Sequence, residues 1–127
     1  MGKSFLIDTN VIIDFSHGIF SEKSKNFVAS ILNKAPIISA ITQIELLGFS
    51  VVSPQIESFV RYTSIIGIND SVIEETIRIR KYCRIKLPDA IIAATALTNN
   101  LTLLTRNMAD FINIENLNVI NPHEIEL

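Results

Sequence analysis

Four acidic residues that lie far apart in the sequence or in different segments could together bind one metal ion. They are Asp8, Glu45, Asp89 and Asp110. Clustered carboxylates repel one another and raise one another's pKa unless a cation compensates. Oxygen ligands without Cys or His suit Mg²⁺ or Mn²⁺, which keep several waters and add substrate phosphate oxygens as ligands. Such an ion lowers the pKa of a bound water and neutralises the charge that develops on a phosphodiester. The predicted chemistry is therefore metal-assisted phosphodiester hydrolysis.

The elements that must position these acids are predicted from short apolar runs bounded by polar or turn residues. Runs that are apolar on both faces suit a parallel sheet covered on each side, and segments with helical spacing of apolar residues lie between them. The predicted strands are Phe5–Ile7, Pro36–Ile38, Ile65–Ile68, Leu101–Leu104 and Leu117–Ile120. The predicted helices are one near Val11, one in Ser21–Ala35, one from Ser53-Pro54, one over Asp70–Arg84, and one that opens at Asp89 after Pro88 breaks the pattern.

Strands that alternate with helices imply a three-layer α/β fold with a central four- to five-stranded parallel sheet flanked by helices. We expect residues 1–127 to form a single domain, because no repeat, low-complexity segment or linker interrupts them. Open parallel sheets bind ligands at the carboxyl ends of their strands. Asp8 ends the first strand, Glu45 falls in the first turn of the helix after the second, and Asp110 follows the fourth. These acids are therefore expected to converge at one edge of the sheet.

Each of the three main acids also has a purely structural interpretation. Asp8 can cap the helix that begins near Val11, as Asp often does. The spacing from Thr42 to Glu45 matches a capping box, in which Glu45 bonds back to the backbone of Thr42. Asp89 after Pro88 is an ordinary helix start that gains from the helix dipole. Taken singly, none of these positions separates the structural role from the functional one.

Four segments in order carry a resemblance to a known family: Leu6–Asn10, Ile41–Leu47, Leu87–Ala96 and Leu104–Phe111. Together they resemble PIN-domain nucleases over essentially the whole chain, and a stand-alone PIN domain of this size most closely resembles the VapC-type toxins of bacterial and archaeal toxin–antitoxin pairs. The resemblance implies a PIN-like fold and a Mg²⁺- or Mn²⁺-dependent endoribonuclease that cuts RNA. It also implies a homodimer, and a co-expressed antitoxin that threads into the active-site groove.

The resemblance also assigns roles to individual residues. Asp8, Glu45 and Asp89 match the family's acidic metal-binding positions and are the expected catalytic residues. Thr9 or Asn10, together with Thr105, match polar residues that support the site.

The fourth segment departs from the family pattern at Asn107, where the family often has an acidic residue. Asp110 lies three residues later. Either Asp110 helps through a water, or the site works with three carboxylates and Asn107 as a neutral ligand. This departure favours one well-held metal ion, with any second ion bound weakly or only with substrate.

The composition offers no bulk attraction for nucleic acid, since 11 basic and 13 acidic residues give a formal net charge of −2. Five basic residues nevertheless crowd into one stretch, which is either a solvated helix face or a phosphate-contacting ridge leading to Asp89. The expected RNA contacts are Arg84 and Lys86, nearest to Asp89, and Arg106. The two Tyr and seven Phe are interpreted mostly as core residues, so no stacking platform is predicted. The five basic residues are Arg78, Arg80, Lys81, Arg84 and Lys86.

One cysteine and the lack of any apolar run of about 20 residues favour a cytoplasmic protein with no membrane contact. Two other functions stay open. A catalytically weak or inactive PIN-like domain could bind RNA or a protein, as Asn107 would allow. A phosphatase or phosphotransfer domain could use Asp8 as its nucleophile, but Asn10 stands where such enzymes have a second Asp. The sequence leaves transfer, ribosomal and messenger RNA equally open as substrates.

Overall fold

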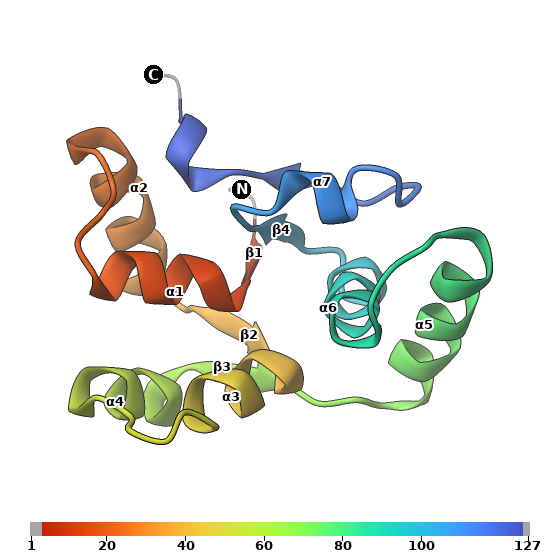
Figure 1. The fold of residues 1–127 in the computed structure, drawn as a ribbon, viewed down its shortest axis with the longest axis horizontal. Helices are drawn as coiled ribbons and strands as arrows, with labels where there is room; N and C mark the ends of the chain where they lie inside the picture. Colours follow the sequence, from red (N-terminus) through yellow and green to blue (C-terminus); the bar gives the residue numbers. More distant parts are fainter. Residues whose placement is uncertain (1–3, 126–127) are drawn as a thin grey trace.

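Five short strands and their connecting helices follow the chain order that the apolar runs predict (Figure 1). The computed structural model describes residues 4–125, so residues 1–3 and 126–127 of the predicted domain lie outside the described residues. None of the helices in that described range is long and apolar enough to cross a membrane. The strands are β1 (Phe5–Ile7), β2 (Ile37–Ser39), β3 (Ser64–Ile66), β4 (Thr102–Leu104) and β5 (Val119–Ile120). The helices are α1 (Thr9–Ser16), α2 (Glu22–Leu32), α3 (Ala40–Leu47), α4 (Pro54–Tyr62), α5 (Asp70–Tyr82), α6 (Leu87–Thr98), α7 (Met108–Phe111) and the 3₁₀ helix η1 (Pro122–Glu124).

All strand pairs are parallel, which confirms the predicted α/β fold with a parallel sheet flanked by helices. The hydrogen-bonded sheet has three strands in the order β1-β4-β5, and β2 pairs with β3 in a separate ladder, so the expected count of four to five strands in one sheet is corrected. β1 and β2 still lie side by side. Strands of two or three residues make few ladder bonds, and the twist between neighbouring strands is enough to separate such short ladders.

Successive residues of β1 and β4 face two different hydrophobic clusters. Leu6 and Leu103 are fully buried in a cluster with α5, α6 and α7. Their neighbours Ile7 and Leu104 are fully buried in a second cluster with α1, α2, α3 and α4. Because side chains alternate across a strand, a sheet covered by helices on both sides needs apolar residues at consecutive positions. The two groups of helices lie on opposite sides of β1 and β4 in Figure 1.

Helix α6 begins earlier than the sequence predicts. It starts at Leu87 and includes Pro88 in its first turn, so the expectation that Pro88 breaks the pattern and that the helix opens at Asp89 is wrong. The first turn of a helix tolerates proline because its N–H groups have no partner within the helix. Asp89 therefore lies inside the first turn of α6 rather than at its start. At α4, by contrast, Ser53 caps the helix as expected, accepting a hydrogen bond from the backbone N–H of Ile56.

Small residues let α6 pack closely inside the cluster formed with α5 and the sheet. Ala90, Ala93, Ala94 and Ala96 are all fully buried there. A buried alanine leaves no room for a larger side chain, because protein interiors are close-packed.

Replacing Ala93 by Leu is expected to lower the free energy of unfolding by about 1–3 kcal/mol, because the added carbons must displace packed neighbours. Urea unfolding followed by circular dichroism measures this change. Ala35→Leu, at an exposed position before β2, is the matched control and should leave stability nearly unchanged. Equal stability of the two variants would contradict the close packing of α6.

Candidate functional site

The carboxylate of Asp8 is fixed at the carboxyl end of β1 by three hydrogen bonds. Asp8 is 5% exposed. Its Oδ1 accepts from the backbone N–H of Thr9 at 2.8 Å, so Asp8 caps α1 as the structural interpretation predicts. Its Oδ2 accepts from the hydroxyl of Thr105 at 2.8 Å and from the amide of Asn10 at 3.1 Å. One oxygen therefore serves the helix, and the other joins the ends of β1 and β4.

Thr105 and Asn10 join the segments that follow β4 and β1. The Thr105 oxygen also accepts from the side-chain amide of Asn10 and from the backbone N–H of Asn107, both at 3.1 Å. Asn10 Oδ1 accepts from the backbone N–H of Arg106 at 2.9 Å. The structure thus brings Asn10 and Thr105 together beside Asp8, where the sequence places supporting residues.

Glu45 lies elsewhere on its helix than the sequence predicts. Ser39, the last residue of β2, caps α3 by accepting from the backbone N–H of Thr42 at 3.1 Å. α3 therefore begins at Ala40, and the prediction that Glu45 lies in its first turn is wrong. The donor of the suggested capping box is already bonded to Ser39. Glu45 instead accepts a hydrogen bond from the hydroxyl of Thr9, which links α3 to α1.

The three acids assigned by the resemblance line one pocket with a volume of about 540 Å³. Asp8 comes from the end of β1, Glu45 from α3 and Asp89 from the first turn of α6. Apolar side chains complete part of the wall, and Asn107 lies in it too. We call this the carboxylate pocket; it is lined by Asp8, Thr9, Asn10, Ile13, Ile44, Glu45, Gly48, Phe49, Asp89 and Asn107.

The carboxylates in this pocket are close enough to oppose one another's ionisation. Burial raises the pKa of Asp8 to about 6, hydrogen bonds from Thr105 and Thr9 oppose this, and the charges of Asp89 and Glu45 raise it further. Burial also raises the pKa of Asp89, as do the charges of Asp110 and Glu45, whereas the charge of Lys86 lowers it. A cation in the pocket would favour the ionised form of both groups.

The acids share a pocket without forming a complete ligand set. Within residues 4–125, no group of three or more Asp, Glu, His or Cys side chains lies in a geometry that could hold a metal ion. Glu45 is exposed, and its carboxylate is turned to Thr9. Asp110 does not line the carboxylate pocket but lies in a neighbouring one, which shares Asp89.

Sequence reasoning missed Asp14, which is 3% exposed on α1. Nη1 of Arg106 lies 2.8 Å and 2.9 Å from its two carboxylate oxygens, and Nε2 of His123 lies 2.8 Å from Oδ2. The available signal was an acid on the buried face of α1, beside Val11 and Ile12. Asp14 thereby ties α1 to the segment after β4 and to η1, and it holds the side chain of Arg106.

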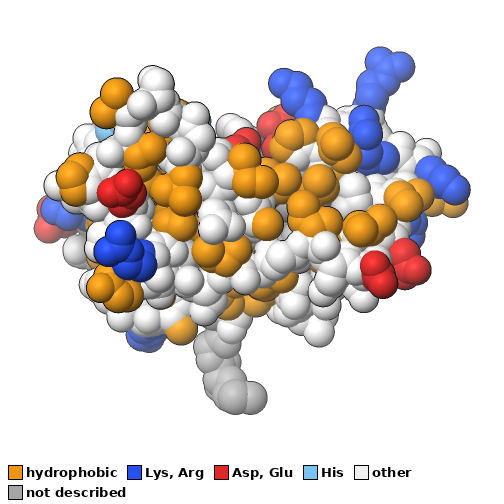
Figure 2. Space-filling model, turned by 90° about the horizontal axis from the view of Figure 1, so that it is seen from below, with side chains coloured by type: hydrophobic (Ala, Val, Ile, Leu, Met, Phe, Trp, Pro, Cys, Tyr) orange, Lys and Arg blue, Asp and Glu red, His pale blue; other side chains and the backbone are white. Residues whose placement is uncertain are grey.

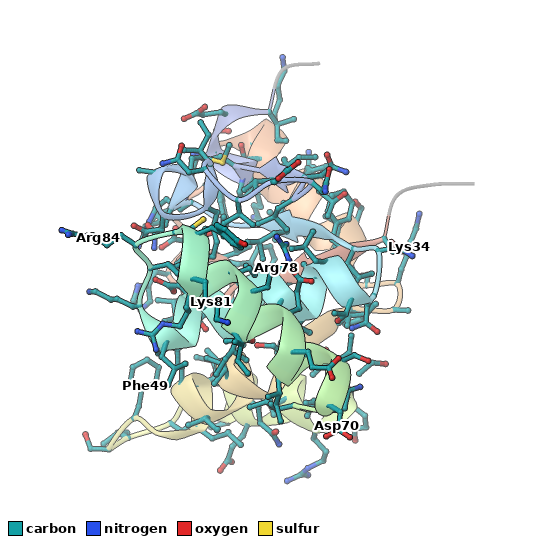
Figure 3. The ribbon with its side chains drawn as sticks, turned by 90° about the vertical axis from the view of Figure 1, so that its right-hand side faces the viewer. Lys34, Phe49, Asp70, Arg78, Lys81 and Arg84 are labelled. Carbon is teal, nitrogen blue, oxygen red and sulfur yellow. The ribbon has the colours of Figure 1, made fainter. Side chains whose placement is uncertain are left out.

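The basic stretch divides between two parts of the surface. Arg78 forms an ion pair with Glu75, and both line a pocket that contains no residue of the carboxylate pocket. Arg84 and Lys86 line the pocket that shares Asp89 with the carboxylate pocket. Figure 3 shows Arg84 projecting on the same side of the molecule as Phe49, which belongs to the carboxylate pocket.

The comparisons with a family profile and with solved structures agree with one another. The sequence profile of the PIN domain matches residues 5–116. No match is found among curated proteins. A chain of a toxin–antitoxin complex from Klebsiella pneumoniae is 32% identical, with a TM-score of 0.77 over 96% of this chain and 100% of that chain. FitAcB from Neisseria gonorrhoeae is similar at 26% identity, with a TM-score of 0.78 over 95% and 99%. VapBC2 from Rickettsia felis shares the fold at 24% identity, with a TM-score of 0.73 over 92% and 97%.

The raised pKa of Asp8 predicts a pH-dependent cost of folding in the metal-free protein. The folded state binds this proton more tightly than the unfolded chain, where the pKa is 3.8. The stabilising contribution of Asp8 is therefore complete below a pH of about 4 and is lost as the pH rises through about 6. Between these limits, the stability of Asp8→Asn relative to wild type should rise by about 3 kcal/mol.

Urea unfolding in EDTA at a series of pH values measures this difference. Asp70→Asn, which changes an exposed acid in the first turn of α5, is the control and should show no such trend. A difference between Asp8→Asn and wild type that stays constant with pH would contradict the buried, uncompensated charge.

Asp14→Asn is expected to lower the free energy of unfolding by about 1–3 kcal/mol, because the charged hydrogen bonds to Arg106 and His123 are lost at a buried position. Urea unfolding at neutral pH measures the loss. The exposed acid Glu57 on α4 supplies the control, since Glu57→Gln removes a charge with no buried partner. An Asp14→Asn protein as stable as wild type would show that this network adds nothing to the fold.

Proposed function

Because the chain belongs to the PIN domain family, we propose that it is a Mg²⁺- or Mn²⁺-dependent endoribonuclease and the toxin of a toxin–antitoxin pair. The observation that carries the proposal is the carboxylate pocket, in which Asp8, Glu45 and Asp89 converge from three separate elements. Residues 1–127 act as one cytoplasmic domain in this proposal. The similarity of this protein to a chain of the Klebsiella pneumoniae toxin–antitoxin complex supports the assignment as a toxin.

The residues of the carboxylate pocket suit a hard divalent cation. The ionisable side chains that line the pocket are all carboxylates, which Mg²⁺ and Mn²⁺ prefer as ligands. Burial raises the pKa of both Asp8 and Asp89, and a neighbouring basic residue, Lys86, opposes this only at Asp89. In the proposal, Asp8 and Asp89 hold the ion and Glu45 completes the set after turning from Thr9. A divalent ion bound there supplies positive charge that activates a water and stabilises the phosphodiester as negative charge builds up.

The chain's own polar residues prepare this pocket. Thr105 and Asn10 hold one oxygen of Asp8, and the backbone N–H of Thr9 holds its other oxygen. Fixed donors of this kind keep a carboxylate from turning away when the substrate arrives. Because the three acids are not already arranged as ligands, we propose one ion, bound most firmly when phosphate oxygens join it. Asn107 is then a neutral neighbour of the ion. Asp110 lies in the adjoining pocket, from which its charge acts on Asp89.

Three basic side chains are proposed to contact the RNA backbone. Arg84 and Lys86 are exposed beside Asp89, and Arg106 is half exposed where Asp14 holds it. Because Asp14 already holds the side chain of Arg106, this side chain would lose little further conformational entropy when it binds RNA. These residues supply locally the positive charge that the net composition lacks.

The apolar side of the carboxylate pocket suits a protein partner. Ile44, Leu47 and Phe49 are exposed large apolar residues on α3 and just after it, and Ile44 and Phe49 line the pocket. Figure 2 shows apolar side chains spread over the face seen from below. We propose that a cognate antitoxin covers this surface and thereby closes the pocket. The exposed Ile73 and Ile77 on α5 offer a separate surface for the proposed homodimer.

Cleavage of RNA by the purified protein should require Mg²⁺ or Mn²⁺ and stop in EDTA. Asp89→Asn should lower the rate by about 100-fold or more, because several kcal/mol of charge stabilisation depend on the ion. Asp70→Asn is the matched control, since Asp70 also lies in the first turn of a helix but not in the pocket. Gel analysis of labelled RNA fragments measures the rates.

Cleavage that survives both EDTA and Asp89→Asn would refute the metal-dependent mechanism. The alternative of an inactive binding domain predicts a different result, namely RNA binding without cleavage and no heat of Mg²⁺ binding in calorimetry. Asp8→Asn would then leave the calorimetric trace unchanged, whereas the nuclease proposal requires the heat to disappear with this substitution.

A further inference from the structure

A second pocket adjoins the carboxylate pocket and shares Asp89 with it. Its volume of about 540 Å³ falls within the range of about 300–1,000 Å³ that small-molecule sites occupy. One wall comes from the end of α5 and the segment leading to α6, and the other comes from α7 and the residues after it. The side chains that matter below are Tyr82, Arg84, Lys86, Asp89, Asp110 and Asn113.

Tyr82 gives this pocket an aromatic surface that the sequence did not reveal. It is the last residue of α5 and is 81% exposed, so it is an exception to the expectation that the aromatic residues are mostly core residues. A helix end with little covering structure leaves the ring in solvent. An exposed aromatic ring at a pocket can stack on an unpaired base, and such stacking tolerates any base because every base has a π-face.

Two cations follow Tyr82 along the same wall. Arg84 and Lys86 are exposed, line the pocket, and alternate with the partly buried Ile85. Alternation in this extended segment sends both cations to the solvent side while Ile85 packs against the core. Lys86 directly precedes α6, whose first turn carries Asp89. Positive charge therefore leads from Tyr82 to the carboxylate pocket.

A hydrogen bond between Cys83 and Asn113 joins the two walls of this pocket. The thiol of Cys83 lies 3.7 Å from the backbone carbonyl of Asn113 and donates to it, and the backbone N–H of Cys83 donates to Ile79 at 2.8 Å. Tyr82 and Arg84 flank this residue, so their backbone is held against the segment after α7. Asp110 and Asn113 offer hydrogen-bonding groups from that opposite segment.

We propose that this second pocket is a nucleotide subsite for single-stranded RNA. One base stacks on Tyr82, its phosphate lies against Arg84 and Lys86, and the chain continues past Asp89 into the carboxylate pocket. Asp110 and Asn113 meet the edge of the stacked base and favour bases that can donate to a carboxylate. A paired base could not reach the ring, so the substrate is an unpaired loop or end. The subsite rests on the proposed nuclease function. It adds the path of the RNA strand across the surface and the recognition of one unpaired base.

The chain contains no Trp and only two Tyr, which makes the tyrosine emission a direct probe. Tyr62 and Tyr82 each end a helix and are 80% and 81% exposed, so they form a matched pair. With Tyr62→Phe, the emission reports Tyr82 alone, and with Tyr82→Phe it reports Tyr62 alone. Both are combined with Asp89→Asn, which slows cleavage during the titration, and each is titrated with a short single-stranded RNA.

Saturable quenching of Tyr82, without saturable quenching of Tyr62, is the expected result. An RNA of the same length that lacks its bases should bind through its phosphates but leave the Tyr82 emission unquenched. Equal quenching of both tyrosines would overturn the subsite. Quenching of Tyr82 by an acidic peptide as strong as that by RNA would also overturn it, and would identify the pocket as a protein-binding surface.

Cleavage kinetics separate this proposal from the nuclease proposal. Tyr82→Ala should raise the KM for single-stranded RNA about tenfold with little change in kcat, whereas Tyr62→Ala should change neither. Arg84→Ala should raise KM and weaken its dependence on salt. If metal-dependent cleavage is present but Tyr82→Ala leaves KM unchanged, the subsite is wrong and the nuclease stands. If RNA quenches Tyr82 but no metal-dependent cleavage occurs, the nuclease proposal is wrong, and the second pocket binds single-stranded RNA that the protein does not cut.

Discussion

The site depends on a carboxylate held away from water at the end of a parallel strand. Asp8 is buried directly after β1, and burial raises its pKa to about 6. Three hydrogen bonds, from Thr9, Thr105 and Asn10, hold the group there. They satisfy its oxygens but supply no positive charge. The remaining electrostatic cost is what makes this position suited to a cation.

The two-sided core is what lets such short strands hold that carboxylate in place. With only three residues each, β1 and β4 make few backbone hydrogen bonds, and the burial of consecutive residues on opposite faces adds hydrophobic stabilisation. Ile7 and Leu104 are register partners, so Asp8 and Thr105, the next residues, come out side by side. Packing of two helical layers thus determines a single hydrogen bond between side chains 97 residues apart.

Charged residues are distributed unevenly over the two adjoining pockets. The chain is slightly acidic as a whole; three of its 13 acidic residues line the carboxylate pocket, and two of its basic residues, Arg84 and Lys86, line the pocket beside it. Asp89 belongs to both pockets, and Lys86 lowers the pKa that burial raises. Interactions of this kind act over a few ångströms and are screened beyond about 10 Å in salt. A sum over the sequence therefore says little about where a polyanion binds.

The sequence by itself determined what nearest neighbours along the chain control: the apolar runs that become strands, the Ser53 cap of α4, and Asp8 directly after β1. It also indicated that Asp8, Glu45 and Asp89 come to one edge, since parallel strands share a carboxyl end. Only the tertiary structure decided the division of the sheet, the contact of Glu45 with Thr9, and the network of Asp14 with Arg106 and His123. These partners lie far apart in the sequence, and local spacing does not specify which segments meet across the core. Exposure of Tyr82 is decided in the same way, because spacing places it on a helix but only packing leaves its ring in solvent.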